Sequence, residues 1–427
     1  MLNRAVVLIR EKIITNPLFS GSVLMLLGTN VYHAGQFLFH IIAGRVLGKA
    51  QYGDLAVLMN ILGIFALVQI SLGLTVVKFI ASERDEKKVS GLVKWALNWS
   101  TVFGLIIAIF ILVSANFISD FLNLSQSQAT YYLAPVIFFY SLVSITRSIL
   151  QGMLKFGWYV VGVLSEVGVK LILVMIFFTA GYAVVGGMLA VSIAVALSFL
   201  VGLFPLRKYF LNKKAHSPNS NSLFKYSIPA FLQGIALTSM YSTDLFLVKH
   251  YFSPETAGLY AGLTKLGSIV FFAAFPIAHV MFPLIAKRHS HGESYHSIFY
   301  LSLLLTAGIA GIIILFYLVT PKVFLSVLGS GFLEGSSMLW WFGLFMGLLS
   351  FAMLFIQFYL SIGKTFVVGY FIAAAFLQIT LIVLFHNNLL QVVQMSILSV
   401  ALLVICLLVY FPYHAAVNKK CVKNLSL

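Results

Sequence analysis

The stretch that decides the fold is Gly44–Leu62, which reads G-R-V-L-G-K-A-Q-Y-G-D-L-A-V-L-M-N-I-L. It ends one long apolar run, crosses a short polar turn and begins the next apolar run. A looser copy lies about 205 residues later, at Phe252–Gly267, and reads F-S-P-E-T-A-G-L-Y-A-G-L-T-K-L-G. In this alignment Gly53 matches Gly258. The copy predicts that the chain consists of two related halves.

The composition of the chain determines its broad class. Hydrophobic residues make up 61% of the sequence and charged residues 9%, and the mean hydropathy is +1.03. A soluble protein of this length needs far more charge to cover its surface. Two cysteines, Cys406 and Cys421, give no disulfide framework. We therefore expect an all-α polytopic membrane protein.

Twelve apolar runs are long enough to cross a bilayer as helices. The polar, Ser- and Asn-rich segment 206–225 lies between the sixth and seventh runs and predicts a linker between two six-helix lobes. The predicted spans are 21–44, 52–80, 92–115, 131–151, 158–180, 184–205, 226–250, 258–283, 296–319, 336–361, 366–386 and 389–413. The predicted domains are an N-terminal cytoplasmic or interfacial segment (1–20), an N-lobe (21–205), the cytoplasmic linker (206–225), a C-lobe (226–413) and a cytoplasmic tail (414–427).

The distribution of basic residues predicts the orientation of these spans. Twenty of the 27 Lys and Arg residues fall in segments on the side of the N-terminus, and only Arg45, Lys49, Lys249 and Lys322 fall on the other side. The positive-inside rule then places both termini in the cytoplasm. The net charge of +16 is explained by this topology and by contact with the anionic headgroups of the bilayer, so nucleic-acid binding is not expected. Because six is an even number, the two lobes are parallel repeats, which suits an alternating-access site between them.

The turn L-G-K-A-Q-Y-G-D-L-A, after a first span ending in A-G-R, resembles the pattern of bacterial polysaccharide flippases. These proteins belong to the multidrug/oligosaccharidyl-lipid/polysaccharide exporter superfamily. The resemblance implies two six-helix bundles in a V-shaped, MATE-like fold. It also implies a monomeric transporter, not an enzyme, in the bacterial cytoplasmic (inner) membrane. Its cargo would be an undecaprenyl-diphosphate-linked oligosaccharide, moved from the inner to the outer leaflet for O-antigen or capsule synthesis, alongside other polysaccharide-assembly proteins.

Polar residues inside the predicted spans are candidates for the transport pathway, because a charge near mid-membrane costs about 2.5–3.5 kcal/mol on insertion scales. At 100° per residue, one face of the first helix gathers a stripe of polar and small residues. The alternative is that each histidine is a hydrogen-bonded packing residue. Protonation of a histidine in this stripe would couple transport to H+, and Na+ is the other candidate coupling ion; no cofactor or metal is expected. The stripe consists of Thr29, Asn30, His33, Gln36, His40 and Gly44.

Two further groups of intramembrane residues are candidates. The seventh helix carries Tyr241 and Asp244, and the eighth carries Lys265. We predict that Lys265, helped by Arg45, attracts the diphosphate of the cargo; the alternative is a structural Asp244–Lys265 ion pair.

Glu166 and Lys170 on the fifth helix lie four residues apart, which predicts either a structural ion pair along the helix or cavity lining. Lys78 and Arg147 lie near inner helix ends, so we expect them to extend to the headgroups and assign them no transport role.

Other functions fit the sequence less well. A multidrug extruder of the same superfamily would bind cations and require acidic residues in its cleft. A membrane polysaccharide polymerase would require a large outer loop with clustered polar residues, whereas the segments 116–130 and 320–335 contain one lysine between them. A major-facilitator transporter would read G-x-x-x-D-R-x-G-R-R between its second and third spans, where this chain has S-E-R-D-E-K-K-V-S-G. The histidines at 279, 289, 291 and 296 do not have the spacing of a tight metal site.

Overall fold

The computed structural model describes residues 17–83, 85–211 and 220–424. The described residues form helices and contain no strand, which confirms the all-α prediction. Nine of the described helices are long and apolar enough to cross a membrane. The chain is therefore a multi-pass membrane protein. Most of the predicted interfacial segment 1–20 and the middle of the predicted linker 206–225 lie outside the described residues.

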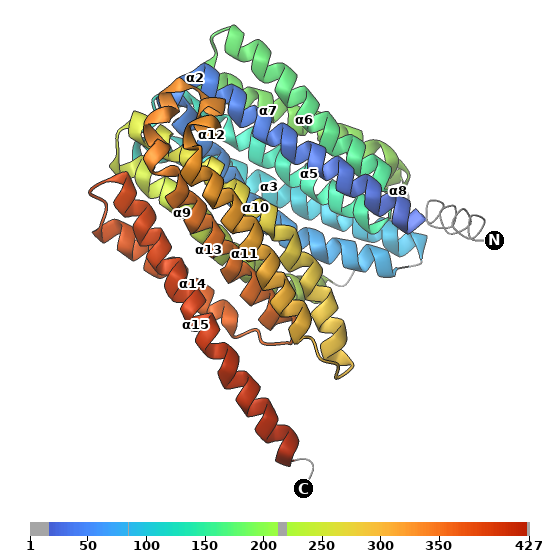
Figure 1. The fold of residues 1–427 in the computed structure, drawn as a ribbon. Coiled ribbons are helices and arrows are strands. Elements are labelled where there is room, and N and C mark those ends of the chain that lie inside the picture. Colours follow the sequence, from blue (N-terminus) through green and yellow to red (C-terminus); the bar gives the residue numbers. More distant parts are fainter. Residues whose placement is uncertain (1–16, 84, 212–219, 425–427) are drawn as a thin grey trace, which may run out of the picture. The chain divides into compact units, whose positions relative to one another are not determined.

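The chain divides into two compact units. Unit 1 comprises residues 1–47 and 54–234, and unit 2 comprises residues 48–53 and 235–427. In Figure 1 the helices of unit 1 run from blue to green and those of unit 2 from yellow to red. The long first helix therefore contributes to both units: its six residues Gly48–Gly53 belong to unit 2, and the parts on either side belong to unit 1.

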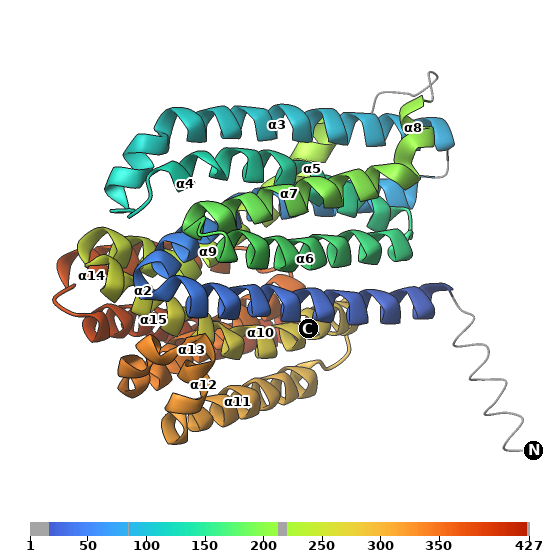
Figure 2. The same ribbon diagram turned by 90° about the horizontal axis from the view of Figure 1, so that it is seen from above.

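Unit 1 is a bundle of six long helices, because its first helix, α2, is interrupted at Gly48 (φ 70°, ψ 179°) and counts twice. Figure 2 shows α3, α5, α6, α7 and the first half of α2 running side by side. In the sequence, the short helix α4 follows α3, and the short helix α8 comes after α7. The bounds are α2 (Pro17–Ser82), α3 (Glu86–Phe121), α4 (Gln128–Tyr131), α5 (Leu133–Gly152), α6 (Phe156–Thr179), α7 (Ala183–Leu203), the 3-10 helix η1 (Phe204–Leu206) and α8 (Arg207–Leu211).

Unit 2 also contains six long helices among its described residues, together with two short ones. Among the helices that are long and apolar enough to cross a membrane, α13 is the most buried, since 72% of its apolar 18-residue segment lies inside the protein. The twelve predicted spans thus correspond to the two halves of α2 and to ten further long helices. The bounds are α9 (Ser220–Tyr251), α10 (Pro254–Ser290), α11 (His296–Val319), α12 (Pro321–Leu328), the 3-10 helix η2 (Ser330–Ser337), α13 (Leu339–Ser361), α14 (Val367–Leu384) and α15 (Leu389–Asn424).

The two related sequence stretches meet inside unit 2. Gly48 adopts a positive φ, which only glycine adopts without strain, and this breaks α2 at the predicted turn. A Cβ atom on Gly258 would lie 1.7 Å from the carbonyl oxygen of Lys49, and one on Gly53 would lie 2.8 Å from the Cα atom of Gly258. The turn and the start of α10 therefore pack backbone against backbone. The Lys49 ammonium also pairs with the carboxylate of Glu334 in η2.

Short polar contacts hold the ends of the helices of unit 1. Asp54 is buried and accepts hydrogen bonds from the backbone N–H of Ser125, at 2.8 Å, and from its hydroxyl, which fixes the loop between α3 and α4. At the other end, Lys155 donates to the carbonyl oxygen of Pro205 at 2.9 Å. Burial and, to a smaller extent, repulsion from Lys208 lower the pKa of Lys155.

Candidate functional site

Two glycines allow α2 to approach α6 closely. A Cβ atom on Gly28 would lie 2.6 Å from Cγ1 of Val160, and one on Gly35 would lie 2.3 Å from Cγ2 of Val167. The glycines are seven residues apart, which is about two helical turns, so they lie on one face of α2. Tyr32 lies between them in the sequence. The close approach brings the polar side chains of α2 to the polar side chains of α6.

Filling this contact should disturb the site. In the variant Gly35→Ala the new methyl group would overlap Val167, and overpacking of this kind costs about 1–3 kcal/mol of unfolding free energy. The matched control is Gly168→Ala on α6, where an added Cβ atom meets nothing within 4 Å. Unfolding in detergent measures both variants. Equal stability of Gly35→Ala and Gly168→Ala would contradict the close packing of α2 on α6.

The central interaction of unit 1 is an ion pair between α5 and α6. Nη2 of Arg147 lies 2.5 Å from Oε2 of Glu166, whose side chain is only 4% exposed. The other carboxylate oxygen, Oε1, accepts hydrogen bonds from the hydroxyl of Tyr32 at 3.0 Å and from Nε2 of Gln36 at 3.3 Å. Both carboxylate oxygens of Glu166 are thus occupied by donors from neighbouring helices. A buried charge needs this compensation to stay ionised.

Arg147 is held from several sides. Its Nη2 atom also donates to the hydroxyl of Ser198 at 3.0 Å, and that hydroxyl donates to the carbonyl oxygen of Gly162 at 2.7 Å. The guanidinium carbon lies 5.7 Å from the centre of the Tyr32 ring. The predicted extension of Arg147 to the headgroups is wrong, because its side chain is only 13% exposed and turns to Glu166 within the bundle.

Lys170 takes a different partner from the one predicted. Its ammonium donates to Oε1 of Gln36 and lies 4.8 Å from the centre of the Phe39 ring. Glu166 forms its ion pair across helices with Arg147 instead of along α6 with Lys170. The Gln36 side chain therefore links the two, since its amide nitrogen donates to Glu166 and its amide oxygen accepts from Lys170. The cluster contains two cations and one carboxylate.

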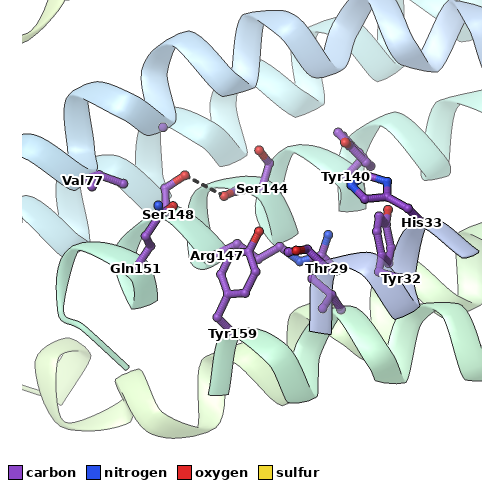
Figure 3. Close-up of a pocket in the computed structure, with 12 residues that line it drawn as sticks. Thr29, Tyr32, His33, Val77, Tyr140, Ser144, Arg147, Ser148, Gln151 and Tyr159 are labelled. Atoms are coloured by element: carbon purple, nitrogen blue, oxygen red, sulfur yellow. Dashed lines mark hydrogen bonds between the residues drawn. The ribbon is translucent and has the colours of Figure 1, made fainter. Parts of the chain in front are cut away.

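A polar cavity of about 320 Å³ lies beside this cluster within unit 1. Arg147 is the charged residue of its lining, and the other members are mostly hydroxyl, amide and aromatic side chains. Figure 3 shows these side chains converging from α2, α5 and α6. The lining consists of Thr29, Tyr32, His33, Gly73, Val77, Tyr140, Ser144, Arg147, Ser148, Gln151, Tyr159 and Val163.

The predicted polar stripe of the first helix is divided by the structure. Thr29 and His33 of this stripe line the cavity. His40 is buried instead and contacts the Phe39 ring edge-on, with ring centres 5.5 Å apart. Asn30 and Arg45 are exposed and lie outside the lining of this cavity.

The predicted residues of unit 2 form no ion pair with one another. Asp244 is fully buried and accepts hydrogen bonds from the Tyr260 hydroxyl at 2.7 Å and from the backbone N–H of Leu245 at 2.8 Å. The alternative of an Asp244–Lys265 pair is therefore wrong. Lys265 on α10 is half-buried, and its ammonium has no acceptor within the described part of the chain. Tyr241 packs against the rings of Phe271 and Phe272, at 6.0 and 6.1 Å.

Comparison with known proteins identifies the family. The model of the family described as polysaccharide biosynthesis protein matches residues 19–289, which is more than half of the chain. The chain belongs to this family. No curated protein matches the sequence of this family member.

Solved structures of other proteins share the fold of this chain. An inward-facing multidrug resistance MATE family transporter of the MOP superfamily aligns with a TM-score of 0.77 at 14% identity, covering 90% of this chain and 96% of that chain. The lipid II flippase MurJ in an inward closed conformation aligns with a TM-score of 0.73 at 15% identity, covering 91% of this chain and 87% of that chain. The predicted MATE-like fold is thus confirmed, and the proteins that share it are transporters and flippases.

Arg147 is the residue that sequence reasoning missed. It lies five residues before the end of α5, so its position suggested a headgroup contact. The available signal was Glu166, a residue of opposite charge in the interior of the next helix, 19 residues later. Two opposite charges inside consecutive spans favour a pair across the helices, because each lowers the cost of burying the other.

Proposed function

We propose that this polysaccharide biosynthesis family member moves a lipid-linked oligosaccharide, joined to undecaprenol by a diphosphate, from the inner to the outer leaflet. The observation that carries the proposal is the guanidinium of Arg147 beside a polar cavity inside an apolar bundle. Its Nη1 group makes no hydrogen bond with a described residue. A guanidinium presents five N–H donors, and phosphate oxygens are among its best acceptors.

The balance of buried charges favours an anionic cargo. The buried carboxylates of the described residues are Asp54, Glu166 and Asp244, and each already accepts hydrogen bonds from protein donors. A transporter of cationic drugs needs a carboxylate that can receive the cargo. Lys265, in contrast, has no acceptor among the described residues and can receive a phosphate oxygen.

The setting of this activity follows from the family and the fold. The family acts in polysaccharide biosynthesis, and the lipid II flippase that shares the fold supports a lipid-linked cargo. We place the protein in the bacterial inner membrane with both termini in the cytoplasm, as a monomer that works with other polysaccharide-assembly proteins in O-antigen or capsule synthesis. Alternating access, coupled to H+ or Na+, would move the cargo, and the pathway includes Asn30, His33, His40, Arg45 and Tyr241.

Purified protein in proteoliposomes tests the proposal directly. One sample receives a fluorescent undecaprenyl-diphosphate oligosaccharide, and a membrane-impermeant quencher reports its exchange between leaflets. A parallel sample receives a cationic dye under an imposed H+ or Na+ gradient. We expect exchange of the lipid-linked cargo and no movement of the dye. Protein-free liposomes are the control for spontaneous exchange.

The opposite result would replace the proposal. If the dye moves and the lipid-linked cargo does not, the protein is a multidrug extruder of the same fold. Glu166 and Asp244 would then be the carboxylates to substitute, because their hydrogen bonds to Tyr32 and Tyr260 would have to open to receive a cation.

A further inference from the structure

We propose that the cavity of unit 1 is a subsite for a single sugar ring, namely the ring that is attached to the diphosphate of the cargo. This inference rests on the proposed function, since it assigns one part of a lipid-linked oligosaccharide to one part of the site. It goes further because it identifies residues that would select the sugar, whereas the proposed function concerns the anionic part of the cargo.

The lining of the cavity contains both hydrogen-bond acceptors and hydrogen-bond donors. The Thr29 hydroxyl donates to the carbonyl oxygen of Met25 at 2.7 Å, and the Ser148 hydroxyl donates to that of Ser144 at 3.0 Å (Figure 3). A hydroxyl that has used its proton offers only lone pairs. The Ser148 hydroxyl can therefore accept a hydrogen bond from a ligand, and a phosphate has no proton to give at neutral pH. Sugar hydroxyls can donate to it.

The Arg147 guanidinium, in contrast to these hydroxyls, can only donate hydrogen bonds. Nη2 is used by Glu166 and Ser198, whereas Nη1 makes no hydrogen bond with a described residue. A ligand that carries both anionic acceptors and hydroxyl donors matches this lining. A sugar ring that carries a phosphate has both, with the phosphate directed to Arg147.

Three more polar groups of the lining have no hydrogen-bond partner among the described residues. The hydroxyls of Tyr140 and Tyr159 and the side-chain amide of Gln151 make no hydrogen bond with any described residue. The phenols can donate and accept, and the amide offers two donors and one acceptor. Such mixed groups suit the hydroxyls of a sugar, which also donate and accept. The tyrosine rings add apolar faces on which the C–H side of a pyranose ring can pack.

The size of the cavity limits what it can hold. Its volume of about 320 Å³ lies at the lower end of the roughly 300–1,000 Å³ that ligand pockets occupy. One sugar ring with its phosphate matches a cavity of this size. Gly73 preserves the space, because a Cβ atom there would lie 2.4 Å from the Ser148 hydroxyl oxygen. The remaining sugars of the cargo would lie outside this cavity.

Leaflet exchange of two matched cargoes tests the subsite. Each cargo is undecaprenyl diphosphate with one N-acetylhexosamine, and the two differ only in the configuration of one ring hydroxyl, as N-acetylglucosamine and N-acetylgalactosamine do. We expect the wild-type protein to exchange one faster than the other. Gln151→Ala and Ser148→Ala should each change the ratio of the two rates by about three- to tenfold, which corresponds to one neutral hydrogen bond. Gly73→Ala, which crowds Ser148, should also change it.

The control is Gln128→Ala, because Gln128 is an exposed glutamine of the same unit outside the cavity lining, and it should leave the ratio unchanged. If Gln151→Ala and Ser148→Ala leave the ratio at its wild-type value, the inference is wrong even where the proposed function holds. Equal wild-type exchange of the two cargoes would overturn it in the same way. If the wild-type protein exchanges no lipid-linked cargo at all, the proposed function fails, and the inference fails with it.

Discussion

The double variant Arg147→Met/Glu166→Leu is expected to unfold with nearly the wild-type free energy and yet to exchange the cargo much more slowly than the wild-type protein. The two side chains form a buried ion pair at 2.5 Å. Replacing both partners of such a pair by apolar residues of similar size is often neutral or stabilising, because neither charge has to be desolvated. The variant keeps the same net charge as the wild-type cluster, since one cation and one carboxylate are removed together.

The single variants should behave differently from the double variant. Glu166→Leu leaves Arg147 and Lys170 as two cations without a carboxylate in the cluster, and removing one partner of a buried pair costs about 3–5 kcal/mol. Arg147→Met should cost less, because Lys170 lies one helical turn from Glu166 and can neutralise it. Both Arg147→Met and the double variant should lose at least about tenfold in leaflet exchange, the value of a charged hydrogen bond.

Reversible unfolding in mixed micelles gives the stabilities, and proteoliposomes give the exchange rates. The four proteins form a double-mutant cycle, and residues in contact are expected to show a coupling energy of about 0.5–3 kcal/mol. Additive losses of stability would contradict the ion pair. Wild-type exchange in the double variant would contradict the transport role of Arg147 while leaving its structural role intact.

The fold followed from the sequence because lipid imposes strong constraints on it. In a bilayer every backbone polar group must be paired within the chain, so long apolar runs have to be helices. The break between the first two runs was predictable for a local reason: Gly48 adopts the positive φ that the turn requires. The repeated glycines pointed to related halves, and the structure adds that Gly53 and Gly258 are in backbone contact.

The site was less predictable, because its partners come from different helices. The pattern along α6 predicted either a pair of Glu166 with Lys170 or cavity lining, and the structure shows an ion pair of Glu166 with Arg147 of α5. Which helices become neighbours depends on small residues such as Gly35. Gly35 lets α2 approach Val167 of α6, and the sequence alone does not show that these two residues meet. Spacing along one helix thus identified the buried charges, but it could not identify the partner of Glu166 on another helix.

Lys265→Ala is expected to slow leaflet exchange strongly without lowering the stability of the protein. The Lys265 ammonium has no acceptor within the described residues, although the side chain is half-buried in an apolar helix. Removing a cation that stabilises nothing should leave the unfolding free energy unchanged or raise it, since burial of a charge is costly. If Lys265 binds the diphosphate, its loss removes a charged hydrogen bond to the cargo, so exchange should fall at least about tenfold.

Two further variants test whether a loss of exchange in Lys265→Ala is due to the positive charge at this position. Lys265→Arg keeps the positive charge and should retain most of the exchange, because a guanidinium also binds phosphate oxygens. Lys322→Ala removes an exposed lysine of the same unit on α12 and should change neither stability nor exchange. A loss of stability in Lys265→Ala would assign this residue a structural role, whereas full exchange by Lys265→Ala would exclude it from the binding of the cargo. The expected combination of lost exchange and intact folding is the one that a cargo-binding cation produces, because the interaction that Lys265 makes is formed only when the cargo is present.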